Sequence, residues 1–185
     1  MLPARRPYRF SVARYEQMIA SGILTENDPV ELIRGEIVQK MPIGDEHFAC
    51  VIGLNRLFQR RLGDAATVSV QNPIRLADSE PEPDVTLLAP RDDDYASGKP
   101  RPSDIFLVVE VADTTLDYDR EVKLRLYAEN GIGEYWIVNL ADRSLEVYRQ
   151  PRPDGTYREA RTLRPGELVE VQALPGTTFP VGDLV

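Results

Sequence analysis

Hydrophobic residues recur with the period of an α-helix in the first third of the chain. Residues 12–19 follow this pattern after Ser11, a residue type that caps helix N-termini, and Gly22 lies just beyond them. A second helix is predicted from Asp45 up to Gly63, because apolar residues return every three or four positions and glycine favours a helix end. The apolar positions near one face of this helix are Phe48, Val51, Ile52, Leu57, Phe58 and Leu62.

Runs rich in β-branched and aromatic residues predict the strands. Residues 30–41 have the pattern of a hairpin around Arg34-Gly35. Residues 105–111, I-F-L-V-V-E-V, form an apolar run with Glu110 near its end, of the kind found in strands that are buried on both faces. A third helix is expected over residues 116–130, before Gly131. Further strands are expected at residues 67–76, 84–88, 134–139 and 145–149, with strand and turn over residues 157–185.

This order of elements predicts an α/β domain built on a mixed sheet, with an N-terminal helix and hairpin. The 185 residues, 42 % of them hydrophobic, suit a single domain over residues 1–185. No apolar run approaches the roughly 20 residues that a membrane span needs, so we expect no membrane partner. The single cysteine, Cys50, cannot form an internal disulfide, which favours a reducing cytoplasmic location.

The net charge of −8 argues at first against a nucleic-acid partner, but the charge is unevenly distributed. Residues 1–62 hold 9 basic and 7 acidic side chains, residues 63–119 hold 4 and 13, and residues 120–185 hold 9 and 10. The acidic excess therefore lies in the middle third. An acidic cluster can hold a hard cation such as Mg²⁺, although most runs of like charge are simply exposed to solvent.

Three residues are the strongest candidates for chemistry: Asp84 in P-E-P-D-V, Glu110 in V-V-E-V-A, and Lys123 in the helix that follows. Asp84 opens one predicted strand and Glu110 closes another, so antiparallel neighbours would bring both carboxylates to one edge of the sheet. Such a pair can bind a divalent cation, which lowers the pKa of a bound water and polarises a phosphoryl oxygen. The alternative for Lys123 is a surface ion pair with Asp119, four residues earlier.

These blocks, with the segment D-R-E-V-K-L-R-L-Y-A-E-N-G-I-G-E-Y-W-I-V-N, resemble a large bacterial family of restriction-endonuclease-like proteins that is abundant in cyanobacteria. The resemblance runs from about Ser11 to about Tyr148. It implies the PD-(D/E)XK nuclease superfamily, whose fold is a central mixed sheet flanked by helices. The usual activity of that superfamily is Mg²⁺-dependent hydrolysis of phosphodiester bonds.

The resemblance also implies roles for individual residues. It places the two motif carboxylates, as metal ligands, at Asp84 and Glu110. The superfamily usually has its lysine two residues after the glutamate, where this chain has Ala112, and the family resemblance moves that lysine to Lys123. Tyr127 matches a family position one helical turn further on.

Glu31 and His47 match family positions as well, and the resemblance implies that both line the same cleft. The alternatives are an exposed strand charge for Glu31 and a local hydrogen bond for His47. Gln71 also matches, but we interpret it as a polar strand residue that faces its neighbour. Cys50, three residues after His47, is expected to fill apolar space, and no G-x-S-x-G motif supports a serine hydrolase.

The resulting hypothesis is a cytoplasmic endonuclease that hydrolyses DNA with Mg²⁺ or Mn²⁺. Asp84, Glu110 and Lys123 would be its catalytic residues, with support from Glu31, His47 and Tyr127. The alternative is a non-catalytic binding or dimerisation module that keeps the nuclease fold. A homodimer is expected, with an apolar surface supplied by Tyr135, Trp136 or the C-terminal strands.

Overall fold

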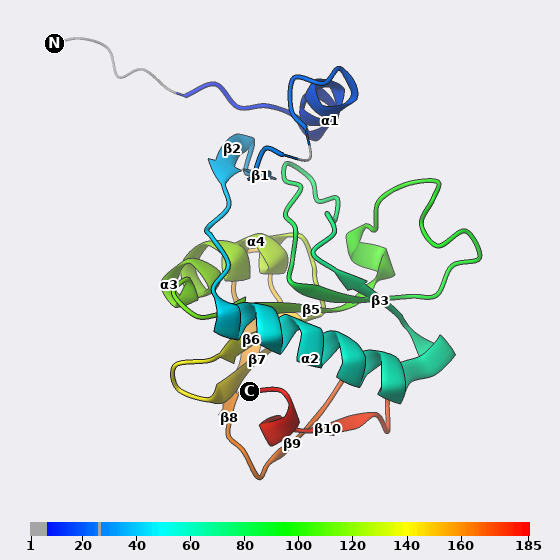
Figure 1. Ribbon diagram of the computed structural model, residues 1–185, viewed down its shortest axis with the longest axis vertical. Helices are drawn as coiled ribbons and strands as arrows, with labels where there is room; N and C mark the ends of the chain where they lie inside the picture. The colour runs from blue at the N-terminus through cyan, green and yellow to red at the C-terminus, as the bar shows by residue number, and fades with distance from the viewer. Residues whose placement is uncertain (1–6, 26) are drawn as a thin grey trace, which may run out of the picture.

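A six-stranded mixed sheet forms the centre of the computed structural model, which describes residues 7–25 and 27–185 (Figure 1). Its strands are β3 (Thr67–Val70), β4 (Val85–Leu88), β5 (Ile105–Ala112), β6 (Glu134–Asn139), β7 (Ser144–Pro151) and β8 (Tyr157–Leu163). They lie side by side in this order, and every neighbouring pair is antiparallel except β5 and β6, which are parallel. The predicted α/β fold with a mixed sheet is confirmed.

Helices cover both faces of this sheet. Helix α2 (Asp45–Leu62) packs on one face of the sheet, where it shares a hydrophobic cluster with Leu107, Val109 and Val111 of β5. The other face is covered by a helical segment that links β5 to β6. This segment consists of α3 (Leu116–Tyr118), a π-helical turn (Asp119–Lys123) and α4 (Leu124–Glu129). Successive residues of β5 point to opposite faces of the sheet, so both layers bury apolar side chains against the same strand.

Helix α2 buries only part of the apolar face that the sequence predicted. Its buried residues are Val51, Leu54, Phe58 and Leu62. Two residues of the predicted face point to solvent instead, since Phe48 is 61 % exposed and Ile52 is 50 % exposed. Apolar residues occur on more than one side of this helix, and only one stripe about 100° wide can meet the sheet. The sequence could not show which stripe that would be.

The N-terminal helix and hairpin lie above the sheet in Figure 1. Helix α1 (Val12–Ala20) is capped by the Ser11 side chain, which accepts a hydrogen bond from the backbone N–H of Arg14 at 3.3 Å. Strands β1 (Val30–Ile33) and β2 (Glu36–Gln39) pair through a two-residue turn. Both turn residues have positive φ, 50° at Arg34 and 76° at Gly35, as a type I′ hairpin turn requires.

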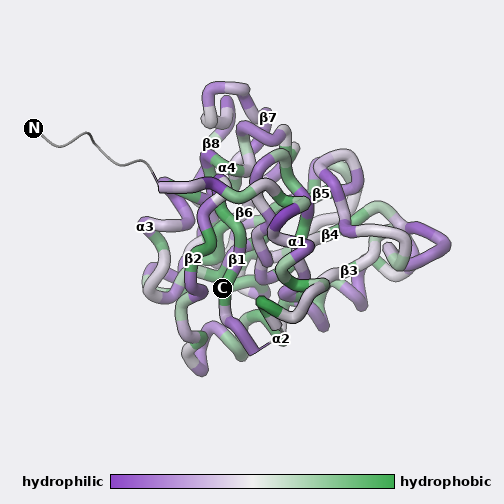
Figure 2. The backbone as a smooth tube through the Cα atoms, turned by 90° about the horizontal axis from the view of Figure 1, so that it is seen from above, coloured by the Kyte–Doolittle hydropathy of each residue, from purple (hydrophilic) through white to green (hydrophobic). Residues whose placement is uncertain are grey.

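Two predictions are wrong, the extent of one strand and the residues of a dimer surface. The strand expected over residues 67–76 ends at Val70, because Gln71 adopts a positive φ of 50° and turns the chain away. Tyr135 and Trp136 are fully buried within the core, so they supply no dimer surface. In Figure 2, hydrophobic residues gather in the interior of the molecule and hydrophilic residues predominate in the outer loops.

The C-terminal residues close the α2 side of the core. Strands β9 (Leu168–Glu170) and β10 (Thr178–Pro180) form a separate antiparallel pair. Phe179 of β10 contacts Phe58 of α2 edge to face, with ring centroids 5.2 Å apart. Across the residues described here, no helix has the length and apolar character needed to cross a lipid bilayer.

Candidate active site

Asp84 and Glu110 meet at one edge of the central sheet. Strands β4 and β5 are antiparallel with Val85 opposite Val109, so the next residues outward, Asp84 and Glu110, also face each other. Glu110 Oε2 accepts a hydrogen bond from the backbone N–H of Asp84 at 3.4 Å, and Asp84 Oδ2 accepts one from the backbone N–H of Val111 at 2.9 Å. The antiparallel pairing of adjacent strands thus places two buried carboxylates side by side.

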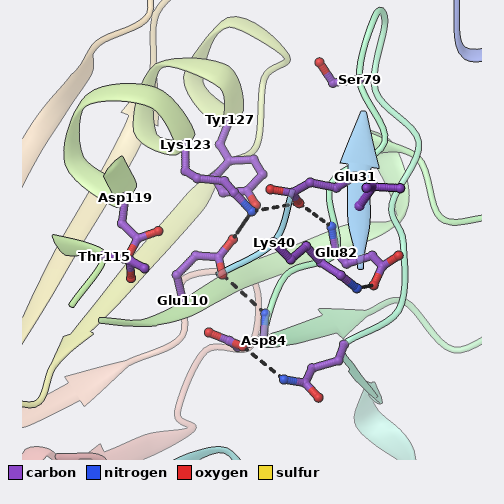
Figure 3. Close-up of polar contacts among 12 residues, drawn as sticks. Glu31, Lys40, Ser79, Glu82, Asp84, Glu110, Thr115, Asp119, Lys123 and Tyr127 are labelled. Carbon is purple, nitrogen blue, oxygen red and sulfur yellow. Dashed lines mark hydrogen bonds and ion pairs between the residues drawn. The ribbon is translucent and has the colours of Figure 1, made fainter. Parts of the chain in front are cut away.

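Lys123 joins this pair from the helical layer (Figure 3). Its Nζ lies 3.2 Å from Glu110 Oε1 and 3.2 Å from Glu31 Oε2, and all three side chains are buried. The alternative of a surface ion pair with Asp119 is wrong, because Lys123 is buried and forms its ion pairs with Glu110 and Glu31. Lys123 ends the π-helical turn, a feature that often occurs at functional sites.

Two further residues fix the position of these groups. Tyr127, one turn after Lys123, donates a hydrogen bond from its hydroxyl to Glu110 Oε1 at 2.6 Å. Glu31 comes from the hairpin strand β1 and also accepts a hydrogen bond from the backbone N–H of Glu82 at 3.2 Å. Glu31 is therefore a buried ion-pair partner and not an exposed strand charge.

His47 and Gln71 belong to the same site because both contact the Asp84 carboxylate. His47 lies in the first turn of α2, and its Nε2 is 2.9 Å from Asp84 Oδ2, so its hydrogen bond is not a local one. Gln71 Nε2 donates to Asp84 Oδ1 at 3.4 Å. Gln71 thus contacts the site directly, which the sequence interpretation did not predict.

Burial and the neighbouring charges shift the proton affinities of these groups. Burial raises the pKa of Glu110 to about 8; the positive charge of Lys123 opposes this shift, while Asp84 and Asp119 add to it. Burial by itself would lower the pKa of Lys123, but the carboxylates of Glu110, Glu31 and Asp119 outweigh it and raise the pKa, so the lysine stays protonated. The hydrogen bond to Asp84 raises the pKa of His47.

Asp119 is a site residue that the sequence interpretation missed. Its side chain is only 4 % exposed and accepts a hydrogen bond from the Thr115 hydroxyl at 2.7 Å. Burial raises the pKa of its carboxyl to about 6, and the nearby charges of Lys123 and Asp84 also act on it. The available signal was its spacing, since residues 119, 123 and 127 lie four apart and share one helix face.

Cys50 has the structural role that the sequence predicted. It packs against the core on the α2 side, and its Sγ lies 3.7 Å from the backbone oxygen of Leu184. Burial raises the pKa of the thiol to about 11, which disfavours the reactive thiolate. Cys50 is therefore a packing residue and not a nucleophile.

The donor set of this site fits a magnesium ion. Asp84 Oδ1 and Glu110 Oε2 each make a single long contact of 3.4 Å, so one oxygen of each carboxylate is only weakly engaged. Within residues 7–25 and 27–185, no group of three or more His, Cys, Asp or Glu side chains is arranged to hold a metal ion alone. Mg²⁺ commonly uses only one or two carboxylates and takes its other ligands from water and substrate phosphate. Two carboxylates are thus a sufficient protein contribution.

Comparisons with known proteins agree with this fold. The sequence model of a family described as "Uma2: Putative restriction endonuclease" matches residues 12–182. The structure is similar to a crystal structure from Anabaena variabilis ATCC 29413, described as "a putative nuclease belonging to DUF820", with a TM-score of 0.66 and 17 % sequence identity. That alignment covers 89 % of this chain and 94 % of the Anabaena chain. A search of curated proteins gave no significant match.

Proposed function

This chain belongs to the Uma2 family, and on that premise we propose that it is a metal-dependent endonuclease that hydrolyses phosphodiester bonds in DNA. The observation that carries the proposal is the convergence of Asp84, Glu110 and Lys123 at one sheet edge, joined through direct contacts of 3.2 Å and 3.4 Å. Two carboxylates beside a buried ammonium combine cation binding with a fixed positive charge. A bound cation and a fixed positive charge both stabilise the negative charge that develops on a phosphate during hydrolysis.

In this proposal, Asp84 and Glu110 hold the Mg²⁺ or Mn²⁺ ion. When bound, the ion polarises a phosphoryl oxygen and promotes ionisation of water. Lys123 supplies a positive charge that stabilises the developing negative charge of the phosphate. Its neighbours act as positioning residues: Glu31 holds the lysine ammonium, and His47 holds the Asp84 carboxylate.

Tyr127 completes the set of supporting residues. Its hydroxyl hydrogen bond at 2.6 Å fixes Glu110 Oε1, so Glu110 Oε2 is the oxygen that can turn toward a cation. Because the tyrosine is fully buried, this hydrogen bond is protected from competition by water.

DNA is the proposed substrate, a reducing cytosol is the proposed location, and a homodimer is the proposed assembly. The family description supports the substrate class, and the single cysteine supports the location. We expect weak, salt-sensitive DNA binding, because the net charge of −8 leaves no broad excess of basic side chains.

A plasmid-nicking assay with the full chain tests this function. The parent protein should nick supercoiled DNA with Mg²⁺ or Mn²⁺ and lose activity with EDTA, and Asp84→Asn and Lys123→Ala should be inactive. Asp92→Asn changes an exposed aspartate outside the site and should cleave like the parent. Cleavage that persists in both site variants would identify a contaminant. A structured RNA, assayed in parallel, distinguishes DNA from RNA as the substrate.

Calorimetric titration with Mn²⁺ separates the enzyme from a non-catalytic module with the same fold. The proposal predicts saturable binding to the parent protein that is lost in Glu110→Gln. If the parent binds no Mn²⁺ and cleaves neither DNA nor RNA, the non-catalytic alternative is correct.

A further inference from the structure

The outward side of helix α2 carries an ordered pattern of charge and apolar surface. Asp45, Ala49, Ile52, Arg56 and Arg60 occur at positions i, i+4, i+7, i+11 and i+15, so they share one helix face, and all five are exposed. We call these residues the α2 outer face. It begins with an acidic residue, is apolar in its middle and ends with two basic residues.

The charged groups of the α2 outer face have no partner within the molecule. Among the residues that the structure describes, Asp45, Arg56 and Arg60 take part in no ion pair, whereas many other charged side chains do. The apolar middle is exposed too, since Ile52 is 50 % accessible. Beside it, a Cβ atom added at Gly53 would meet no atom within 4 Å, so a second helix has room to approach closely.

We propose that the α2 outer face is the interface of a two-fold symmetric homodimer in which two α2 helices pack antiparallel. With the two-fold axis beside Ile52, Asp45 lies seven residues to one side and Arg60 eight residues to the other. At 1.5 Å per residue these separations are about 10.5 Å and 12 Å. Asp45 of each copy therefore stands opposite Arg60 of its partner, and the two isoleucines meet at the centre. This surface is proposed independently of the nuclease activity.

A second copy fits this pattern better than a nucleic acid does. In an antiparallel pair, the acidic end of each α2 helix lies opposite the basic end of the other. The same surface patch is then complementary to itself, as a two-fold interface requires. DNA would place phosphates against Asp45 and would leave Ile52 facing a charged backbone. The exposed Phe48, next to Ile52 on the same helix, adds apolar area to the protein contact.

The oligomeric state of the purified full chain tests the proposal. Light scattering over a concentration series should give the dimer mass for the parent protein and the monomer mass for Ile52→Glu at the same concentration. Ile23→Glu is the matched control, because Ile23 is an isoleucine with 67 % exposure outside α2, and this variant should remain dimeric. Far-ultraviolet circular dichroism checks that all variants are folded. A parent chain that stays monomeric throughout overturns the proposal.

Charge reversal tests the antiparallel arrangement itself. Asp45→Arg or Arg60→Asp alone should weaken the dimer by about tenfold or more, and the double variant should regain much of the lost affinity because both pairs are restored in reverse. Double-variant affinity no better than that of the single variants contradicts this register.

Cysteine cross-linking gives an independent measurement. Ile52→Cys should form an intermolecular disulfide on mild oxidation, whereas Ile23→Cys and the parent chain, whose only cysteine is the partly buried Cys50, should not. Equal cross-linking of Ile52→Cys and Ile23→Cys would argue against the interface. If the protein is monomeric and its DNA binding is lost in Arg56→Glu and Arg60→Glu, the α2 outer face binds nucleic acid and not a second copy.

Discussion

The Lys123 ammonium lies 3.2 Å from the Glu110 carboxylate, although the lysine belongs to a helical layer and the glutamate to the strand beneath it. The contact joins two layers of the fold, and the same ammonium also contacts Glu31 of the hairpin. Three separate elements therefore depend on one buried positive charge. Replacing it should affect both the stability of the protein and its activity.

Lys123→Met should destabilise the protein by about 3–5 kcal/mol, because the buried carboxyl groups of Glu110 and Glu31 lose the ammonium that both of them contact. Urea unfolding at neutral pH measures this change. Lys40→Met is the matched control. It breaks an ion pair with Glu82 that is partly exposed, so it should cost only about 0–1 kcal/mol. Equal losses in the two variants would mean that the buried position of Lys123 is unimportant.

Glu31→Gln should lower nuclease activity about 10- to 100-fold, because residues that orient a metal-site or catalytic group have effects of this size. The loss should appear in kcat with KM little changed, while the urea midpoint shows that the variant is folded. Glu36→Gln, on the other strand of the same hairpin, removes an exposed partner of Arg9 and should leave activity intact. A Glu31→Gln enzyme as fast as the parent would remove Glu31 from the site.

The stability contribution of Glu80 should depend on pH. Burial raises the pKa of this carboxyl above 4.5, although Lys99 opposes the shift. The folded protein then binds the Glu80 proton more tightly than the unfolded chain, so the favourable contribution present at low pH is lost as pH rises through the folded pKa. The parent should therefore lose stability relative to Glu80→Gln as pH rises from about 4 toward 7. Urea unfolding across this range measures the difference, and the opposite slope would contradict the shift.

Leu54→Ala should cost about 2–5 kcal/mol, because Leu54 is fully buried where α2 packs on the sheet. Leu168→Ala removes the same side chain from an exposed position on β9 and should change stability by no more than about 0.5 kcal/mol. Urea unfolding of both variants checks that Leu54, which the sequence did not place on the buried face, meets the sheet.

The local pattern of the sequence was sufficient for most elements. Ser11 caps α1 as predicted, Gly63 follows the end of α2, and the Arg34-Gly35 turn joins β1 and β2. Each of these features depends on capping, turn geometry or periodicity over a few neighbouring residues. Such interactions are present in the sequence itself and do not require distant parts of the chain.

What the sequence by itself determined is therefore the α/β order of elements, the resemblance to a nuclease family and the identity of the candidate residues. Only the tertiary structure decided which groups they contact. Lys123 contacts Glu31 across 92 positions of the chain, Asp119 turns inward, and α2 buries Leu54 while it leaves Ile52 exposed. The reason is physical: periodicity describes each element separately, whereas burial and ion pairing depend on which faces of different elements meet when the layers pack.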